Sequence, residues 1–494
     1  MPSLEINSRR TIQNMIRRIN ATMLTDFYEL AMANGYLKKG MENDIAYFDM
    51  FFRQIPDNGG FAIMAGLEQV IEYIEHLEFT DEDIEYLRSK HGFDERFLEY
   101  LRNFKFECDV WAIPEGTVVF PHEPLLTVRG PVMQAQFLES MILLLINHQS
   151  LIATKTNRIV RAAQGRAVME FGTRRAHGES AAMLGARAAY IAGCVGTACT
   201  ITERDYGVPA LGTMAHSWVQ MFDNEYDAFK AFTECYPENA TLLVDTYNVL
   251  KSGVPAAIKV FRELDPPAKG IRIDSGDVAY LTKQARIMLD EAGLEDCKIV
   301  VSNSLDEYII RDVISEGAKI DSFGVGERLI TAESEPVFGG VYKLAAVERD
   351  GELIPKMKIS ENIEKITNPG FKKLYRIYDK DTNHAIADLV TLEGEEAPSG
   401  DGHQIFDQWN PWRKKRIRNY YVKELMNRIY ENGKLVYEVP GLDETKEYCR
   451  QQVENLWEET KRFENPQPYI VDLSRDLWDL KQEILENYME EIDG

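Results

Sequence analysis

The 494-residue chain is poor in cysteine and has no long apolar run. Its six cysteines are scattered without Cys-x-x-Cys spacing, so we expect reduced thiols. No uninterrupted apolar stretch is long enough to span a bilayer. The first 20 residues carry Arg9, Arg10, Arg17 and Arg18 but lack the apolar core of a secretory signal. The sequence therefore predicts a cytoplasmic protein without a membrane partner.

Positive charge is also scarce, with 56 Lys and Arg against 80 Asp and Glu and a net charge of −24. Binding to a phosphate backbone requires a basic face, so this balance argues against a nucleic-acid partner. Small anionic substrates are compatible with it if Arg and Lys gather locally. The content of 45% hydrophobic and 10% aromatic residues is typical of a soluble globular protein. The length predicts two or three structural units.

The region from residue 167 to about residue 325 contains a repeated pattern. Short apolar runs end in a polar or Gly-rich turn and lead into a helical stretch, recurring every ~20–30 residues, which is typical of parallel βα units closing into a barrel. A doubly wound open sheet would fit the same repeats almost as well. The apolar runs are residues 167–171, 208–216, 241–244, 270–273, 298–301 and 320–323.

The two flanking regions differ from this repeat. Residues 1–150 mix helices and strands, and Thr80 followed by three acidic residues predicts a helix start. Beyond residue 350 the pattern is lost, residues 392–416 resemble a loop, and two helices close the chain, the last capped by Ser474.

We therefore predict an α/β fold with three domains. An N-terminal α+β domain covers residues 1–150 and contributes to a dimer and to the active site. An irregular TIM-like βα barrel covers residues 151–350 and is catalytic. A C-terminal α/β extension, helical at its end, covers residues 351–494 and packs on the N-terminal domain.

Chemically varied residues fall where the predicted strands end. In βα barrels the active site lies at the carboxyl ends of the strands, and such variety at one rim is hard to explain by folding alone. These residues are Arg174, His216, Asp245, Arg272, Asp274, Asn303 and Gly326.

His216 is the candidate whose role depends most on its neighbours. A lone histidine near a turn is more often structural than catalytic. Carboxylates at later strand ends, however, could orient its imidazole and select its tautomer.

Asp274 and Asp277 bracket a tight turn that follows Arg272. Such a pair of carboxylates can hold a divalent cation together with a phosphorylated substrate, although an ordinary Asx or Gly turn is an equal alternative. Arg272 lies two residues before Asp274, so both side chains point to the same face of the strand. A planar guanidinium there suits a ligand carboxylate.

Two neighbouring strand ends lack bulky side chains. They carry Ser302 and Asn303, and Gly324 and Gly326, respectively. Backbone N–H groups at the last strands of a barrel frequently form a phosphate site, which we predict here.

Taken together, these segments resemble the nicotinate phosphoribosyltransferases of the type II phosphoribosyltransferase group. The resemblance runs in order from residue 23 to about residue 343. It includes the segments 23–30, 52–53, 65–67, 170–174, 212–217, 270–277 and 323–326.

The resemblance implies a C–N ligase that joins nicotinate to phosphoribosyl pyrophosphate in the first step of NAD salvage from nicotinate. ATP and Mg²⁺ would take part, with the Mg²⁺ held through the substrate diphosphate rather than by a protein cage. The enzyme would be a homodimer with shared active sites. It would release nicotinate mononucleotide and diphosphate, and ADP and phosphate from ATP.

The same resemblance implies a role for each site residue. His216 would be phosphorylated by ATP, and Asp245, Asp274 and Asp277 would serve the histidine, the ribose and Mg²⁺. Tyr28 would enter from the neighbouring subunit and stack on the pyridine ring opposite Phe171. Arg272 would meet the nicotinate carboxylate, with Arg174 near the ring and the diphosphate. Ser302, Asn303, Gly324 and Gly326 would hold the 5′-phosphate, and the remaining substrate-binding residues would be Asp26, Thr213 and Ser217.

Three other functions compete with this prediction. The sister enzyme that acts on nicotinamide carries an acid in the segment resembling residues 196–199, where this chain has Ala198. A carboxylate there would repel nicotinate, so its absence favours the acid substrate. A barrel lyase or aldolase would need a strand-end lysine or a metal site, and the predicted strands end without lysine. A non-catalytic binding protein would have a broken site, whereas Tyr28, His216, Arg272 and Asp274 are all present.

Overall fold

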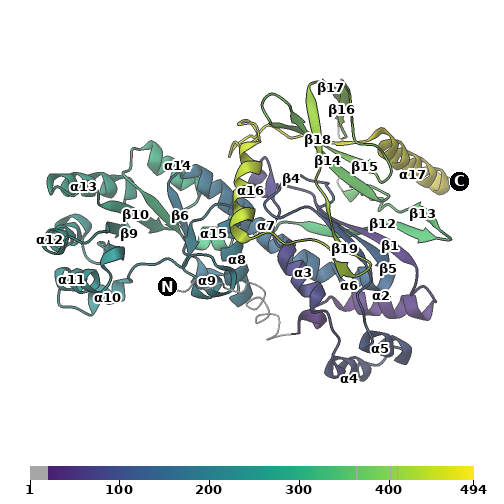
Figure 1. Ribbon diagram of the computed structural model, residues 1–494, viewed down its shortest axis with the longest axis horizontal. Coiled ribbons are helices and arrows are strands. Elements are labelled where there is room, and N and C mark those ends of the chain that lie inside the picture. The colour runs from purple at the N-terminus through teal and green to yellow at the C-terminus, as the bar shows by residue number, and fades with distance from the viewer. Residues whose placement is uncertain (1–19, 363–364, 401, 409, 494) are drawn as a thin grey trace. The chain divides into compact units, whose positions relative to one another are not determined.

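A computed structural model describes residues 20–362, 365–400, 402–408 and 410–493. The first 20 residues were predicted not to be a secretory signal. Their arginines, Arg9, Arg10, Arg17 and Arg18, lie outside the described residues. The chain divides into two compact units, one formed by Met1–Leu151 with Val337–Gly494 and the other by Ile152–Pro336 (Figure 1). The three-domain division stays a prediction.

The first unit contains a seven-stranded antiparallel sheet in the order β13-β12-β1-β5-β3-β19-β20. Strand β1 lies between β12 and β5 and is buried along almost its whole length. The strands of this sheet come from three stretches that are far apart in the sequence. Residues 340–355, for example, form β12, which pairs with β1, and β13, which pairs with β12. Its strands are β1 (Ile45–Phe52), β3 (Asp109–Ala112), β5 (Leu126–Pro131), β12 (Gly340–Arg349), β13 (Glu352–Pro355), β19 (Asn427–Glu431) and β20 (Lys434–Leu435). A separate short pair joins β2 (Ala62–Ile63) to β4 (Val118–Val119).

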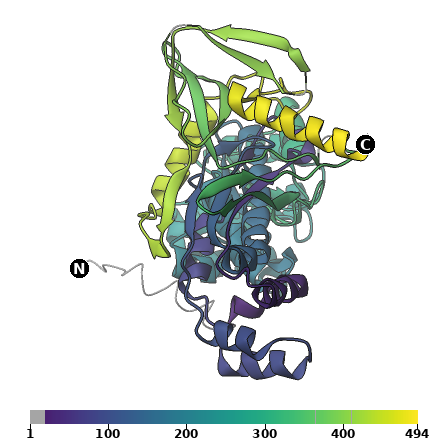
Figure 2. The same ribbon diagram turned by 90° about the vertical axis from the view of Figure 1, so that its right-hand side faces the viewer.

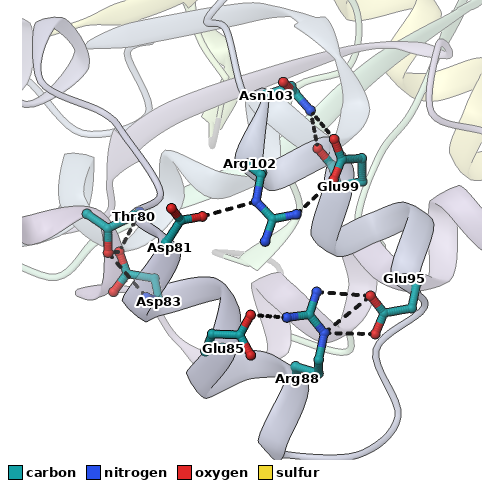
Figure 3. Close-up of polar contacts among 9 residues, drawn as sticks. All are labelled: Thr80, Asp81, Asp83, Glu85, Arg88, Glu95, Glu99, Arg102 and Asn103. Carbon is teal, nitrogen blue, oxygen red and sulfur yellow. Dashed lines mark hydrogen bonds and ion pairs between the residues drawn. The ribbon is translucent and has the colours of Figure 1, made fainter.

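The predicted helix start at Thr80 is confirmed. Thr80 Oγ1 accepts a hydrogen bond from the Asp83 backbone N–H at 3.2 Å, and the Asp83 carboxylate accepts one from the Thr80 N–H at 2.8 Å (Figure 3). Arg88 and Arg102 then tie this helix, α4, to α5 through exposed ion pairs with Glu95 and Asp81. Exposed pairs of this kind add little stability. The helices here are α2 (Phe27–Lys38), α3 (Leu67–Glu75), α4 (Asp81–Ser89), α5 (Glu95–Arg102), α6 (Val132–Phe137) and α7 (Glu139–Ala162).

Among the described residues, one helical segment is long and apolar enough to cross a membrane, judged by length and composition only. It is Val132–Ala162, with 31 residues, and its most apolar 18-residue stretch has a mean hydropathy of 1.3. Because 72% of its most apolar stretch is buried inside the protein, it has the character of a core helix, and a single such helix is weak evidence for a membrane.

The C-terminal part of the first unit contains more strand than the sequence predicts. A four-stranded sheet has the order β18-β14-β15-β21, and α17 packs against β15 (Figure 2). The two closing helices are confirmed, and Ser474 Oγ accepts the Leu477 N–H at 3.2 Å as the predicted cap. The elements are β14 (Lys372–Asp379), β15 (Ala385–Leu392), β16 (His403–Asp407), β17 (Asn410–Ile417), β18 (Tyr420–Glu424), β21 (Val471–Leu473), α16 (Leu442–Glu454) and α17 (Arg475–Asp493).

The predicted loop over residues 392–416 is wrong for its second half. Strands β16 and β17 pair there as an antiparallel hairpin. Four consecutive basic residues in β17 are exposed, so the strand lacks the apolar–polar alternation that marks a half-buried strand. From the described residues of this hairpin, Ile405 and Ile417 join the hydrophobic cluster around Ile377.

A buried ionic group stabilises the contact between β14 and β15. Arg376 donates to both carboxylate oxygens of Asp388, at 2.8 and 2.6 Å, and both side chains are fully buried. Glu123 is buried beside Asp388, and burial together with the Asp388 charge raises the pKa of Glu123 well above 4.5. Burial and the Asp388 charge therefore favour the neutral form of the Glu123 carboxyl.

Glu123→Gln is expected to remove a pH dependence of stability. The folded-state pKa of Glu123 is raised above its unfolded value, so the folded state binds the extra proton and stability falls as pH rises above about 4.5. The glutamine amide keeps a donor towards Asp388 without a titrating proton. The variant should therefore gain stability relative to the wild type as the pH rises above about 4.5. Urea unfolding between pH 4.5 and pH 8 measures this. The exposed substitution Glu85→Gln is the control, and parallel profiles for wild type and Glu123→Gln would show that Glu123 is ionised in the fold.

The second unit is built on a six-stranded parallel sheet in the order β7-β6-β11-β10-β9-β8. The first strand, β6, pairs with the last, β11, as in a barrel. Strands β7 and β8 form two open edges, so the sheet is a half-barrel and the predicted TIM-like repeat is confirmed (Figure 1). The strands are β6 (Ala167–Glu170), β7 (Gly196–Thr197), β8 (Ala240–Leu243), β9 (Lys269–Ile273), β10 (Lys298–Asn303) and β11 (Ser322–Val325).

The predicted strand over residues 208–216 is wrong. Only Ala210 forms a bridge there, to Thr197 of β7, and Pro209 and Gly212 interrupt any longer ladder. His216 consequently begins a helix instead of ending a strand. The helices are α8 (Glu179–Ile191), α9 (Thr200–Tyr206), α10 (His216–Gln220), α11 (Glu225–Cys235), α12 (Val254–Leu264), α13 (Val278–Glu291), α14 (Glu307–Ser315) and α15 (Glu327–Ile330).

Candidate active site

Arg272 is the centre of a hydrogen-bond network at the carboxyl ends of the strands of the second unit. Its Nε donates to Ser302 Oγ at 2.7 Å, its Nη1 to Thr213 Oγ1 at 3.2 Å and its Nη2 to Asp274 Oδ1 at 2.9 Å. Ser302 also donates to Asp274. The predicted same-face pairing of Arg272 with Asp274 is thus an ion pair. A guanidinium has five N–H bonds, so two of them are available to a ligand after these three contacts.

His216 lies between the turns that follow β8 and β9. Its Nδ1 is 3.1 Å from Thr246 Oγ1, and its Nε2 is 4.0 Å from Asp274 Oδ2. The imidazole is 43% exposed, so it is open to a reactant. A hydroxyl on one side and a carboxylate on the other can fix the ring orientation, as the sequence predicts for His216.

Asp245 ties together the turns after β8 and β9. Its Oδ2 accepts hydrogen bonds from Ser275 Oγ at 2.6 Å and from the Asp274 N–H at 3.1 Å. Its Oδ1 is buried and has no hydrogen-bond partner. A buried carboxylate oxygen without a partner is costly, so this atom fits a ligand hydroxyl or a divalent cation. Among the described residues, no group of three or more His, Cys, Asp or Glu could hold a metal ion.

The Phe171 ring forms an apolar wall beside Arg272. The Arg272 Cζ atom lies 5.6 Å from the ring centroid. The ring also packs closely on Gly324, where an added β-carbon would lie 2.5 Å from Phe171 Cδ2. The wall and the guanidinium together suit a flat ring that carries a carboxylate.

Known proteins resemble this chain over nearly its full length. Models of the N-terminal and C-terminal domains of nicotinate phosphoribosyltransferase match residues 23–147 and 371–481. A model of the quinolinate phosphoribosyl transferase C-terminal domain matches residues 152–335. A nicotinate phosphoribosyltransferase from Bacillus subtilis is 42% identical over 461 residues, covering 93% of this chain and 94% of that protein. The chain belongs to the nicotinate phosphoribosyltransferase family.

Two solved structures of enzymes with related names have folds similar to that of this chain. A crystal structure of human nicotinic acid phosphoribosyltransferase has a TM-score of 0.82 at 29% identity, covering 94% of this chain and 100% of that one. A crystal structure of nicotinate-nucleotide pyrophosphorylase from Pyrococcus furiosus has a TM-score of 0.68 at 26% identity, covering 89% and 96%. The resemblance drawn from the sequence motifs is confirmed.

Several residues with predicted family roles have contacts that limit those roles. Asp277 is exposed and caps α13 by accepting the Tyr280 N–H at 2.9 Å, so one of its oxygens is engaged. Asn303 is also exposed, and its side-chain oxygen accepts the Ser304 N–H at 2.7 Å. Arg174 and Ser217 are exposed on the turn after β6 and on α10, and Gly326 precedes α15. Their roles as nicotinate phosphoribosyltransferase site residues stay predictions.

Asp26 and Tyr28 belong to the first unit, at the start of α2. The Asp26 N–H donates to Ser140 Oγ at 3.0 Å, which anchors this end of the helix to α7. Tyr28 is 44% exposed. Partial burial, and a hydrogen bond to Glu139, raise the pKa of Tyr28, so the phenol stays neutral. An exposed neutral aromatic ring suits the stacking role that the family implies.

Four side chains in or beside this network had no predicted role. Thr246 and Ser275 each follow a predicted aspartate directly, so the strand-end rule could have found both. Glu170 and Thr197, by contrast, hydrogen-bond each other inside the sheet. Nothing in their local sequence indicates that pairing, because it depends on the alignment of β6 with β7.

Gly324→Ala is expected to raise the KM for the ring substrate about 10-fold or more, since the new methyl would displace Phe171. Steady-state kinetics with each substrate varied in turn would measure this. An unchanged KM for the ring substrate would show that the added methyl leaves Phe171 in place.

Proposed function

We propose that the protein joins nicotinate to phosphoribosyl pyrophosphate and releases nicotinate mononucleotide and diphosphate. The observation that carries this proposal is the Arg272 guanidinium beside the Phe171 ring, with two N–H bonds to spare, in a chain of this family. Nicotinate is a flat ring with one carboxylate. Arg272 would bind the carboxylate, and Phe171 would stack on one face of the ring.

The other face of the ring would meet Tyr28 of the partner subunit in a homodimer with shared active sites. Asp26 begins the same helix and would support the same surface. The C-terminal extension, in this proposal, packs on the N-terminal domain and holds it in place. The enzyme would act in the cytoplasm.

In the transfer step the ring nitrogen of nicotinate bonds to the anomeric carbon of ribose, and the bond from that carbon to diphosphate breaks. Positive charge develops on the ribose, so catalysis depends on positioning and on nearby carboxylates. Asp245 and Asp274 supply that negative charge, and Asp277 can bind a ribose hydroxyl with its second oxygen. Arg174 would bind the diphosphate, and Thr213 and Ser217 would contact substrate at the start of α10. The 5′-phosphate would lie at Ser302, Asn303, Gly324 and Gly326.

Mg²⁺ would enter with the diphosphate and neutralise part of its charge. The unpartnered Oδ1 of Asp245 is the protein atom that best fits this ion.

ATP would phosphorylate His216. A nitrogen of the imidazole bonds to the γ-phosphorus, the bond to the ADP oxygen breaks, and water later releases phosphate from the histidine. Thr246 and Asp274 orient the ring for this step. The phosphohistidine would favour productive binding of the anionic substrates.

Product identification with three acceptor bases tests the proposal. The enzyme is incubated with phosphoribosyl pyrophosphate and one of three bases: nicotinate, nicotinamide or quinolinate. The products are separated and identified by their mass in a mass spectrometer. We expect product with nicotinate. Product with nicotinamide alone would assign the sister activity, whereas product with quinolinate alone would follow the family model that matches residues 152–335.

A further inference from the structure

Glu170 connects two turns at the rim of the half-barrel. It is the last residue of β6, and its side chain is fully buried. One carboxylate oxygen accepts the Gly172 N–H, and the other accepts Thr197 Oγ1 at 2.5 Å. Its backbone carbonyl accepts the Ala198 N–H at 2.8 Å. A single residue therefore holds both the turn after β6 and the turn after β7.

A buried carboxylate at this position is costly, because burial raises the pKa of Glu170 while the bonds from Thr197 and Gly172 lower it. An apolar residue would fill the same space without that cost. Its two side-chain hydrogen bonds, and not its volume, therefore distinguish glutamate here.

The first turn carries the ring wall. Gly172 follows Phe171 directly, and an added β-carbon at Gly172 would lie 2.6 Å from Ile330 Cβ and 2.7 Å from the Gly326 carbonyl oxygen. The turn that Glu170 holds thus packs closely on the turn of the predicted phosphate site. A shift of Gly172 would move the Phe171 ring.

The second turn leads to Arg272. The Thr197 N–H donates to the Pro209 carbonyl at 2.9 Å, and the Leu211 N–H donates to the Thr197 carbonyl at 2.8 Å. Two residues later, Thr213 accepts a hydrogen bond from the Arg272 guanidinium. A shift of Thr197 would therefore displace Arg272, the residue that we propose binds the nicotinate carboxylate.

We propose that Glu170 is a positioning residue that sets the selectivity for an acid over an amide base. It fixes Phe171 and, through Thr197 and Thr213, Arg272 in one relative arrangement. This inference rests on the proposed function, since the acid that it selects is nicotinate.

Glu170→Ala tests the inference through a ratio of rates. The kcat/KM for nicotinate should fall about 30-fold and that for nicotinamide about 3-fold or less, so selectivity drops about 10-fold. Glu170→Gln should recover most of the selectivity, because its oxygen still accepts the Gly172 N–H and its amide can donate to Thr197 Oγ1. Equal losses with both bases would mean that Glu170 only stabilises the fold, and would overturn the inference.

A double-mutant cycle with Thr197→Val tests the route to Arg272. The double variant Glu170→Ala with Thr197→Val should lose no more selectivity than Glu170→Ala alone, because both remove the same contact. Additive losses would contradict the route. Glu225→Gln is the matched control, since it also alters a buried carboxylate of the second unit, on α11, and should leave the ratio unchanged.

Amide hydrogen exchange separates this inference from the proposed function. In Glu170→Ala, exchange at residues 171–175 and 197–199 should be about 10-fold faster than in the wild type, while α13 should be unaffected. Unchanged exchange at both turns would show that Glu170 holds neither and would overturn the inference. Faster exchange in a protein that lacks activity on nicotinate would leave the positioning role standing and refute the proposed function.

Discussion

His216→Ala is expected to abolish ATP hydrolysis during turnover while slow transfer of the phosphoribosyl group continues at high substrate. The imidazole is the group that accepts a phosphoryl group from ATP under this proposal. Its removal leaves Arg272, Asp274 and Ser302 in contact with one another. At low substrate, kcat/KM should fall about 10- to 100-fold, which is the usual range for the loss of a coupling free energy.

Parallel measurement of ADP and of nicotinate mononucleotide checks this result. The neighbouring substitution Thr246→Ala removes the contact to Nδ1 but keeps the imidazole, so it should lower ADP formation only partly. ADP that still forms in step with product in His216→Ala would assign the phosphoryl acceptor to another residue.

Arg272→Ala is expected to raise the KM for nicotinate about 100-fold, because truncating one partner of a hydrogen-bonded charge pair typically removes 2–5 kcal/mol. The KM for phosphoribosyl pyrophosphate should rise far less. Nicotinamide carries no negative charge, so its KM should also change less than that of nicotinate. Initial rates with each substrate varied in turn measure the three values.

Two further variants separate ligand binding from damage to the network. Arg272→Lys keeps the charge but loses the planar fork, so it should recover only part of the nicotinate affinity. Ser302→Ala removes the Nε contact and leaves the guanidinium in place, and its effect should be smaller than that of Arg272→Ala. Equal losses for nicotinate and phosphoribosyl pyrophosphate in Arg272→Ala would make Arg272 a phosphate-binding or structural residue.

Much of the second unit could be predicted from local patterns. The apolar runs that form β6, β8, β9, β10 and β11 were found within about two residues, because buried parallel strands are short, apolar and closed by turns. The pairing of Arg272 with Asp274 followed from the alternation of side chains along a strand. His216 lies beside one carboxylate, that of Asp274, and it starts a helix instead of ending a strand.

Long-range pairing explains what the sequence did not reveal. Strand β19 pairs with β3 in the sheet that contains β1, although about 300 residues or more separate β19 from both strands. No local pattern in the sequence specifies that β3 is its partner. The hairpin of β16 and β17 was missed because its exposed side chains are almost all polar. The hydrogen bond between Glu170 and Thr197 was missed for a similar reason, since it exists only once β6 and β7 are aligned.

The central claim is that this site joins nicotinate to phosphoribosyl pyrophosphate with ATP hydrolysis coupled through His216. The most direct measurement is the rate of mononucleotide formation from nicotinate and from nicotinamide, each with and without ATP, while ADP is followed in the same reaction. We expect nicotinate mononucleotide, formed faster with ATP and accompanied by ADP, and little product from nicotinamide. A preference for nicotinamide, or nicotinate mononucleotide formed at the same rate without ATP and with no ADP, would contradict the claim.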